Sequence, residues 1–271
     1  MTNITIPDSV TSIRYSAFEG CTGLTGITIP DSVTSIGYSA FEGCTGLTSV
    51  TIPESVTSID DFAFEGCTNL TGIWVNKNNP KYSSDSQGVL FNKDKTKLVA
   101  APGAIKSYTI PDGITSIDSY AFKGCTGLTE ITIPDSVTSI SGSVFAGCTN
   151  LTEVWVDKNN PDYSSDSQGV LFNKDKTKLV AAPGAIKSYT IPDSITSISA
   201  SAFRERTSLT SITIPDSVTV INPNAFNGCT GLTSISYTGT VAEWKSLTKY
   251  ELWNFAVPAR FVQCMDGQVE L

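Results

Sequence analysis

Apolar residues recur along the chain with a period of 23 residues, so one pattern of buried and exposed positions repeats from unit to unit. In the unit that begins at Leu24, the further apolar positions are Ile27, Ile29, Val33, Ile36, Ala40, Phe41 and Cys44. The alternation across Ile27, Thr28 and Ile29 predicts a short strand with one buried face, and Pro30 ends it because proline has no N–H to donate. The later apolar positions return the chain to the core and close one coil. This period predicts a repeat solenoid, whose units contact mainly their neighbours.

The first buried residue of the strand can be followed through the whole array. It recurs in ten coils, at Ile4, Ile27, Val50, Ile73, Tyr108, Ile131, Val154, Tyr189, Ile212 and Ile235. We expect these strands to pair in parallel, each with the strand of the next coil, about 4.8 Å apart. The sequence therefore predicts one curved sheet of about ten parallel strands, with nine repeats between them.

Two repeats are longer than the others. Residues 73–107 and 154–188 form units of 35 residues, and residues 82–112 are identical to residues 163–193. The stretch 88–99 has two apolar runs on either side of an Asn-Lys-Asp turn, which predicts strand, turn and strand. We expect a small β-hairpin insertion in both long repeats, which either projects from the solenoid or packs along its back.

The pattern changes in the last part of the chain, residues 235–271. Trp244 and Leu247, three residues apart, predict a short helix, and Asp266-Gly267 predicts the turn of a terminal hairpin. Solenoids need a cap of this kind to cover the last coil. We therefore divide the chain into a solenoid over residues 1–234 and a C-terminal cap.

Composition excludes several classes of function. A net charge of −8 and a pI of 4.6 disfavour nucleic acid or an anionic membrane surface as the main partner. No apolar run approaches the roughly 20 residues of a membrane span, so we expect no membrane insertion. Histidine is absent, which excludes Ser-His and Cys-His nucleophilic catalysis and removes the commonest transition-metal ligand. We expect a protein that is not an enzyme and has no cofactor or metal.

The seven cysteines contain no CxxC pair, so they lack the spacing of a metal site. Six of them occupy one repeat position, where they are expected to point inward as buried free thiols. Consecutive coils bring these cysteines close enough for a disulfide on distance alone. Cys264 lies outside this series, in a place that allows exposure.

Acidic residues and threonines suggest three further functions, each less well supported. An acidic residue follows the proline of most coils, and such a row can hold Ca²⁺ weakly, although turn chemistry explains it. The pairs Asp60-Asp61 and Asp85 with Asp94 offer the two carboxylates of a glycosidase, but no spacing selects them. The threonine ladder resembles an ice-binding surface, but it is one residue wide and tryptophan interrupts it.

The repeat I-x-I-P-x-x-V-x-x-I-x-x-x-A-F-x-x-C-x-x-L, seen from Ile29 to Leu47, resembles the BspA-like, or treponemal-type, leucine-rich repeat. The likeness extends over essentially the whole chain, including the G-V-L-F-N-K-D-K-T insertions. It implies a right-handed leucine-rich-repeat coil and a bacterial surface or secreted protein, since several members are adhesins for host matrix proteins or other cells. One coil departs from the pattern, because Arg206 stands where a buried cysteine is expected. We expect that coil to open outward at a solvent-facing turn, or to pair the charge.

Met1 leads directly into repeat sequence, without a signal peptide or a wall anchor. Two interpretations fit: a piece of a longer exported protein, or a complete intracellular one. We favour the first, and expect a monomer that is extracellular or lies at the cell surface.

The strand residues between the buried positions face outward, and most carry hydroxyl groups. Trp74 and Trp155 break this series at equivalent places in the two long repeats. An exposed tryptophan supplies a large rigid apolar area for a sugar ring or a partner side chain. The alternative is that each tryptophan packs under the adjoining loop, 77–80 or 158–161. The predicted ligand-binding residues are Trp74, Trp155, Thr51, Thr132 and Glu153.

The sequence thus favours a non-enzymatic binding module at the surface, which adheres to a host or microbial protein or glycan through the sheet face and the insertions. The alternative is a structural spacer that extends a distal domain from the envelope. Exposed aromatic residues near the insertions would favour the binding module, whereas a uniformly polar surface would favour the spacer.

Overall fold

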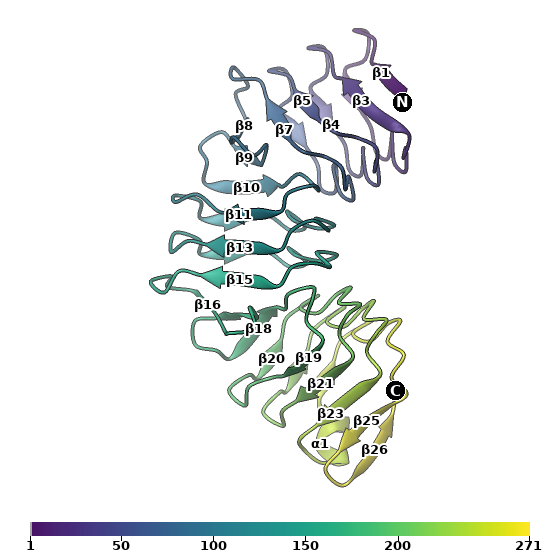
Figure 1. Cartoon of the computed structure of the whole chain (residues 1–271), viewed down its shortest axis with the longest axis vertical. Coiled ribbons are helices and arrows are strands. Elements are labelled where there is room, and N and C mark those ends of the chain that lie inside the picture. Colours follow the sequence, from purple (N-terminus) through teal and green to yellow (C-terminus); the bar gives the residue numbers. More distant parts are fainter. Residues whose placement is uncertain (1) are drawn as a thin grey trace. The chain divides into compact units, whose positions relative to one another are not determined.

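The structure is a computed structural model that describes residues 2–271. It falls into two compact units: unit 1 runs to Leu128 and includes Ser139–Phe145, and unit 2 consists of Thr129–Thr138 and Ala146–Leu271. Each unit is a stack of coils with short strands (Figure 1). The predicted repeat solenoid is confirmed.

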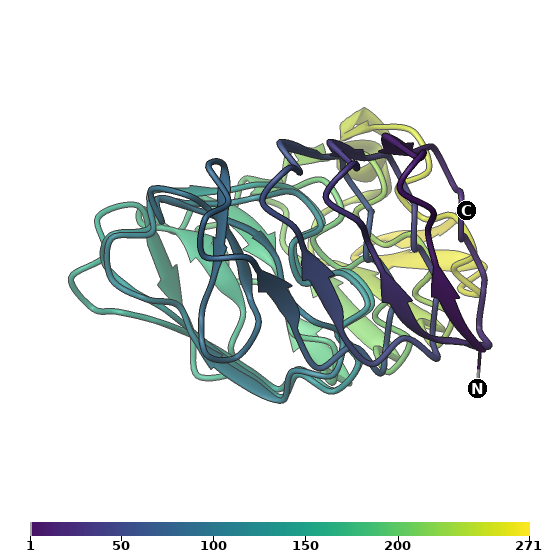
Figure 2. The same ribbon diagram turned by 90° about the horizontal axis from the view of Figure 1, so that it is seen from above.

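One strand from each coil forms a first row, which contains every predicted strand position. In unit 1 these strands are β1 (Thr2–Thr5), β3 (Leu24–Thr28), β5 (Val50–Ile52), β7 (Ile73–Val75) and β11 (Ser107–Thr109). In unit 2 they are β13 (Glu130–Ile133), β15 (Glu153–Val156), β19 (Ser188–Thr190), β21 (Ser211–Ile214) and β23 (Ser234–Tyr237). Equivalent residues pair in parallel, as Val50 does with Ile73 and Ile212 with Ile235. Figure 2 shows the purple and blue strands of unit 1 following one another side by side.

A second row of short strands lies on the return path of the coils, and the sequence pattern predicted only its members in the two insertions. In unit 1 these strands are β2 (Ser12–Ile13), β4 (Ser35–Ile36), β6 (Ser58–Ile59), β10 (Lys97–Ala100), β12 (Ser116–Ile117) and β14 (Ser139–Ile140). In unit 2 they are β18 (Lys178–Ala181), β20 (Ser197–Ile198), β22 (Val220–Ile221) and β24 (Thr248–Lys249). Their parallel pairing is also in register, as for Ile13 with Ile36. Some neighbouring coils are therefore joined by hydrogen bonds in both rows. The first row is not one continuous ladder, because β3 and β5 belong to separate sheets.

The two insertions belong to this second row. In the first, β8 (Tyr82–Ser84) and β9 (Leu90–Asn92) form an antiparallel pair, and β9 also pairs with β10, which in turn pairs in parallel with β12. The second insertion repeats this with β16 (Tyr163–Ser165), β17 (Leu171–Asn173) and β18. Of the two predicted arrangements, packing along the back of the solenoid is the one observed.

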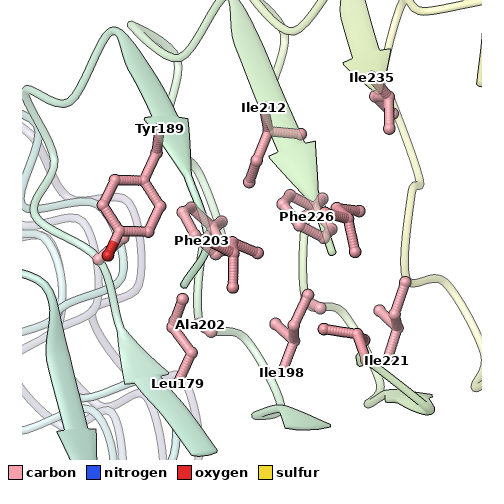
Figure 3. Packing of buried hydrophobic residues seen from close by; sticks show 14 of the residues in the cluster. Leu179, Tyr189, Ile198, Ala202, Phe203, Ile212, Ile221, Phe226 and Ile235 are labelled. Carbon is pink, nitrogen blue, oxygen red and sulfur yellow. The ribbon is translucent and has the colours of Figure 1, made fainter. Parts of the chain in front are cut away.

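Phenylalanine rings stack through the interior of each unit. In unit 1 the ring centroids of Phe18 and Phe41 lie 5.2 Å apart and nearly parallel. In unit 2 the distance between Phe203 and Phe226 is 4.8 Å. Figure 3 shows these two rings between the side chains of both strand rows. The in-register repeat places each ring on its counterpart, and losing one such buried phenylalanine typically costs about 3–5 kcal/mol.

The cysteine series is buried and unpaired, as predicted, apart from Cys21, which is half-buried. The thiols donate to carbonyl groups of the preceding coil, as Cys67 does to Phe41 O at 3.0 Å. Cys229 does the same to Phe203 O, and burial raises its pKa to about 12. Cys264 is buried as well, so the prediction that its position allows exposure is wrong. Its side chain is buried because its strand, β25, continues the first row and alternates exposed with buried residues.

Arg206 is only 1% exposed, so the predicted solvent-facing turn is wrong. The coil does not open outward, and no carboxylate within residues 2–271 forms an ion pair with Arg206. Instead, Nε donates to Ala182 O at 2.8 Å and Nη1 donates to Arg204 O at 3.0 Å. Desolvation lowers the pKa of the guanidinium. The arginine thus performs the cysteine's role of donating to a carbonyl of the preceding coil.

The C-terminal elements cover the end of unit 2. The predicted helix is α1 (Val241–Ser246), and the predicted hairpin is β25 (Phe261–Cys264) with β26 (Gly267–Glu270). Thr240 and Glu243 form a capping box at the start of α1, which satisfies N–H groups that lack helical partners. Strand β25 pairs in parallel with β23 and so continues the first row. The boundary of the cap at residue 235 stays a prediction.

Candidate functional site

The outward face of the first row carries the predicted site residues in two groups, one in each unit. In unit 1, Thr51 on β5 lies directly beside Trp74 on β7. Trp74 is 39% exposed. A Cβ atom on Gly72 would lie 2.5 Å from Cε2 of this indole, so the ring rests on the glycine backbone. The absence of a side chain at Gly72 therefore fixes how Trp74 is presented.

In unit 2, Thr132 on β13 lies beside Trp155 on β15. Trp155 is 42% exposed, and its Nε1 donates to Oε2 of Glu153 at 2.9 Å. Glu153 occupies the repeat position of Gly72. The two tryptophans thus lie on equivalent strands but have different neighbours. Trp155 contacts the carboxylate of Glu153, whereas Trp74 lies against the backbone of Gly72.

The loop after each tryptophan is attached to the coil before it. Asn79 is buried, and its Nδ2 donates to Pro53 O at 2.7 Å and to Val56 O at 2.9 Å. Its Oδ1 accepts from the N–H groups of Lys81 and Tyr82, both at 2.8 Å. Asn160 makes the same four bonds in unit 2. The loops are therefore held by a buried asparagine, while the tryptophans stay partly exposed.

The insertion is connected to the strand that bears the tryptophan. The N–H of Ile73 donates to Gly88 O at 2.9 Å, and the N–H of Val75 donates to Oγ of Ser84 at 3.1 Å. Oδ2 of Asp85 accepts a hydrogen bond from the hydroxyl group of Tyr108 at 2.6 Å. Burial is the largest cause that raises the pKa of Tyr108, and this hydrogen bond is the second. Oδ1 of Asp85 also accepts from the N–H groups of Gln87 at 2.9 Å and Val89 at 3.0 Å, so this carboxylate organises the turn of the insertion.

A second group of residues, which the sequence pattern did not indicate, lies in the turns that follow β6 and β12 in unit 1. We call this part of unit 1 its turn edge. The rings of Phe62 and Tyr120 lie 4.1 Å apart, and Nζ of Lys123 lies 5.1 Å from the centre of the first and 5.3 Å from that of the second. Lys123 also forms an ion pair with Glu65. The signal that reveals this group is a comparison of the two long repeats, because their flanks differ at these positions.

Within residues 2–271, no group of three or more histidine, cysteine, aspartate or glutamate side chains is placed so that it could hold a metal ion. No helix in this part of the chain is long and apolar enough to cross a membrane.

Coils with an in-register strand row, a cysteine series and a stacked phenylalanine column define a leucine-rich-repeat solenoid. The family described as "BspA type Leucine rich repeat region (6 copies)" matches residues 1–91, 100–168 and 182–254. The chain belongs to this family. None of the curated proteins matches the chain significantly.

Solved structures of bacterial leucine-rich repeat proteins are similar to this chain. A leucine rich cell surface protein from Faecalibacterium prausnitzii is 33% identical over 91% of this chain, with a TM-score of 0.64. The similar region spans 62% of that protein. A leucine-rich repeat protein from Eubacterium ventriosum is 23% identical, covering 89% of this chain and 72% of its own, with a TM-score of 0.52. The second likeness concerns the fold alone.

Proposed function

We propose that the chain is a non-enzymatic binding module that is extracellular or displayed at the cell surface, and that it holds a protein or glycan ligand against the first strand row. The partial exposure of Trp74 and Trp155 carries the proposal. Each ring stands beside a threonine of the neighbouring strand. The resemblance to a leucine rich cell surface protein supports the location.

The geometry favours binding over a purely structural spacer. An indole held in place by Gly72 or by Glu153 loses little conformational entropy when a ligand covers it, and rigid aromatic anchors dominate many interfaces. Threonine hydroxyls beside the ring donate and accept hydrogen bonds, which fixes the orientation of a ligand. A polar face with one apolar anchor suits both a sugar ring and a partner side chain.

An array of glycans and host matrix proteins tests this proposal, with the intact chain compared with the double variant Trp74→Ala/Trp155→Ala. We expect the double variant to lose binding by at least about thirtyfold, because truncating an anchor residue costs about 2 kcal/mol or more. Phe255→Ala is the matched control, since Phe255 is an exposed ring in the C-terminal region. Undiminished binding by the double variant would refute the anchor role of the tryptophans. The class of molecule retained on the array identifies the ligand as protein or glycan.

A further inference from the structure

A small cavity opens at the turn edge of unit 1, away from the strand row that bears Trp74. Its volume is about 60 Å³, and four carboxylates and one lysine are among the residues that line it. Lys123 pairs with Glu65, and Asp118 pairs with Lys97 at 2.7 Å. Small-molecule pockets usually measure about 300–1,000 Å³. The cavity therefore suits the head group of one side chain, and not a whole small molecule.

The other two carboxylates that line the cavity belong to Asp60 and Asp61. Both are exposed, and neither forms an ion pair within the described part of the chain. They directly precede Phe62 in the sequence, so two open negative charges adjoin the aromatic rings of this edge. The cation–π geometry of Lys123 shows that a positive group is accommodated over Phe62 and Tyr120.

The aromatic rings continue outward from this cavity. The ring of Tyr38 meets that of Phe62 at 4.9 Å, and Tyr15 stacks on Tyr38 at 5.5 Å. Tyr15 is 71% exposed. We call Tyr15, Tyr38, Phe62 and Tyr120 the aromatic edge. It forms a continuous row of rings that leads from open surface to the acidic cavity.

The coils on either side of the second long repeat show that the fold does not require these side chains. Positions 81 residues later have the same place in the repeat, yet the two rings and three of the carboxylates are replaced there, while Lys123 becomes another cation. Asp60, Asp61, Phe62, Glu65, Tyr120 and Lys123 correspond to Ser141, Gly142, Ser143, Ala146, Ser201 and Arg204. Phe62 and Tyr120 have left-handed backbones, with φ of +60° and +63°, as their serine counterparts do. Bulky residues are unfavourable in this conformation, so their presence calls for a reason beyond folding.

We propose that the aromatic edge and Asp60-Asp61 bind an arginine-bearing or lysine-bearing segment of a partner protein. One cationic head group enters the cavity and pairs with the two aspartates, while the aliphatic stem and neighbouring residues lie along the rings. Arginine fits best, because its planar guanidinium both stacks on aromatic faces and pairs with carboxylates. The net charge of −8 attracts such a segment to the chain.

The test measures binding of a fluorescein-labelled hexa-arginine peptide to the intact chain by fluorescence anisotropy at physiological salt. Phe62→Ser/Tyr120→Ser installs the serines found 81 residues later, in the coils beside the second long repeat, and leaves the net charge unchanged. We expect it to weaken binding about fivefold to tenfold, the usual size of a partly desolvated cation–π contribution. Asp60→Asn/Asp61→Asn preserves side-chain shape and is expected to weaken binding at least as much. It also keeps the test decisive if the serine variant unfolds in a thermal melt.

Asp31→Ser/Glu54→Ser is the matched control, because it removes two exposed carboxylates elsewhere in unit 1. Equal losses in this control and in the Asp60-Asp61 variant would overturn the proposal in favour of general charge attraction. Full binding by the serine variant would overturn it too, as would retention of a neutral oligosaccharide through the same rings in place of the peptide. The experiment on Trp74 and Trp155 uses other residues and other ligands, so the two proposals can fail independently.

Discussion

Removing the buried asparagine of the first insertion loop should destabilise unit 1 strongly. Asn79→Ala deletes four hydrogen bonds at once, two donated to Pro53 and Val56 and two accepted from Lys81 and Tyr82. Each such bond contributes about 0.5–1.5 kcal/mol net. We therefore expect a loss of about 4 kcal/mol in the free energy of unfolding, measured by urea denaturation.

Asn79→Asp distinguishes the two hydrogen bonds that Asn79 accepts from the two that it donates. The carboxylate still accepts from the two N–H groups, but it places negative oxygen where an amide now donates to Pro53 O and Val56 O at 2.7 and 2.9 Å. The charged form is therefore disfavoured in the folded state, which raises the pKa of the new carboxyl above its usual value of about 4. Between the two pKa values the folded state binds more protons than the unfolded state, so stability falls as pH rises.

The measurement is the difference in unfolding free energy between this variant and the unmodified chain from about pH 3 to pH 7. We expect a small difference at the acid end that grows with pH, by at most about 1.4 kcal/mol per pH unit for one proton. Asn78→Asp is the control, because it makes the same charge change at an exposed position and should cost within about 0.5 kcal/mol. A pH-independent difference, or a cost below about 1 kcal/mol for Asn79→Ala, would refute the reasoning.

Three further predictions concern the glycine, the arginine and the thiols. Gly72→Ala should displace the indole of Trp74 and change tryptophan fluorescence, whereas Gly142→Ala, whose Cβ meets nothing within 4 Å, should leave the spectrum unaltered. Arg206→Ala should cost about 3–4 kcal/mol in urea denaturation, because two carbonyl groups lose their donors and a cavity remains; Arg204→Ala, partly exposed, should cost far less. A thiol reagent at pH 8 should label Cys21 first, and Cys229 only after unfolding, since burial holds the pKa of Cys229 at about 12.

The coil could be predicted well from the sequence because the same core positions recur in nearly every repeat. The alternation around Ile27 and the fixed place of Phe41 recur in nearly every unit, so a single deviation does not obscure the pattern. The second strand row could not be found this way. Strands of two residues, such as Ser35–Ile36, are too short to show a period of two. They arise because neighbouring coils pair along the return path, a property of the stack and not of one unit.

The misjudged residues share one physical cause. Sequence rules assign a charged residue such as Arg206 to the surface, but the stack supplies carbonyl acceptors at the cysteine position that suit any donor. Cys264 was misjudged because its strand joins the first row by pairing with β23, a long-range contact that local pattern does not encode. In both cases the neighbouring coil determined the environment.

The two long repeats act as a comparison within one molecule. Residues 82–112 and 163–193 are identical, so the same insertion is placed twice on the same kind of coil. Differences in the flanking coils therefore cannot be attributed to a different scaffold. Both long repeats have a tryptophan at the same position, Trp74 and Trp155, whereas Phe62 and Tyr120 in the coils beside the first have serine counterparts beside the second. This argues that the tryptophans serve a role common to both long repeats, and that the aromatic edge adds a second specificity to unit 1 alone.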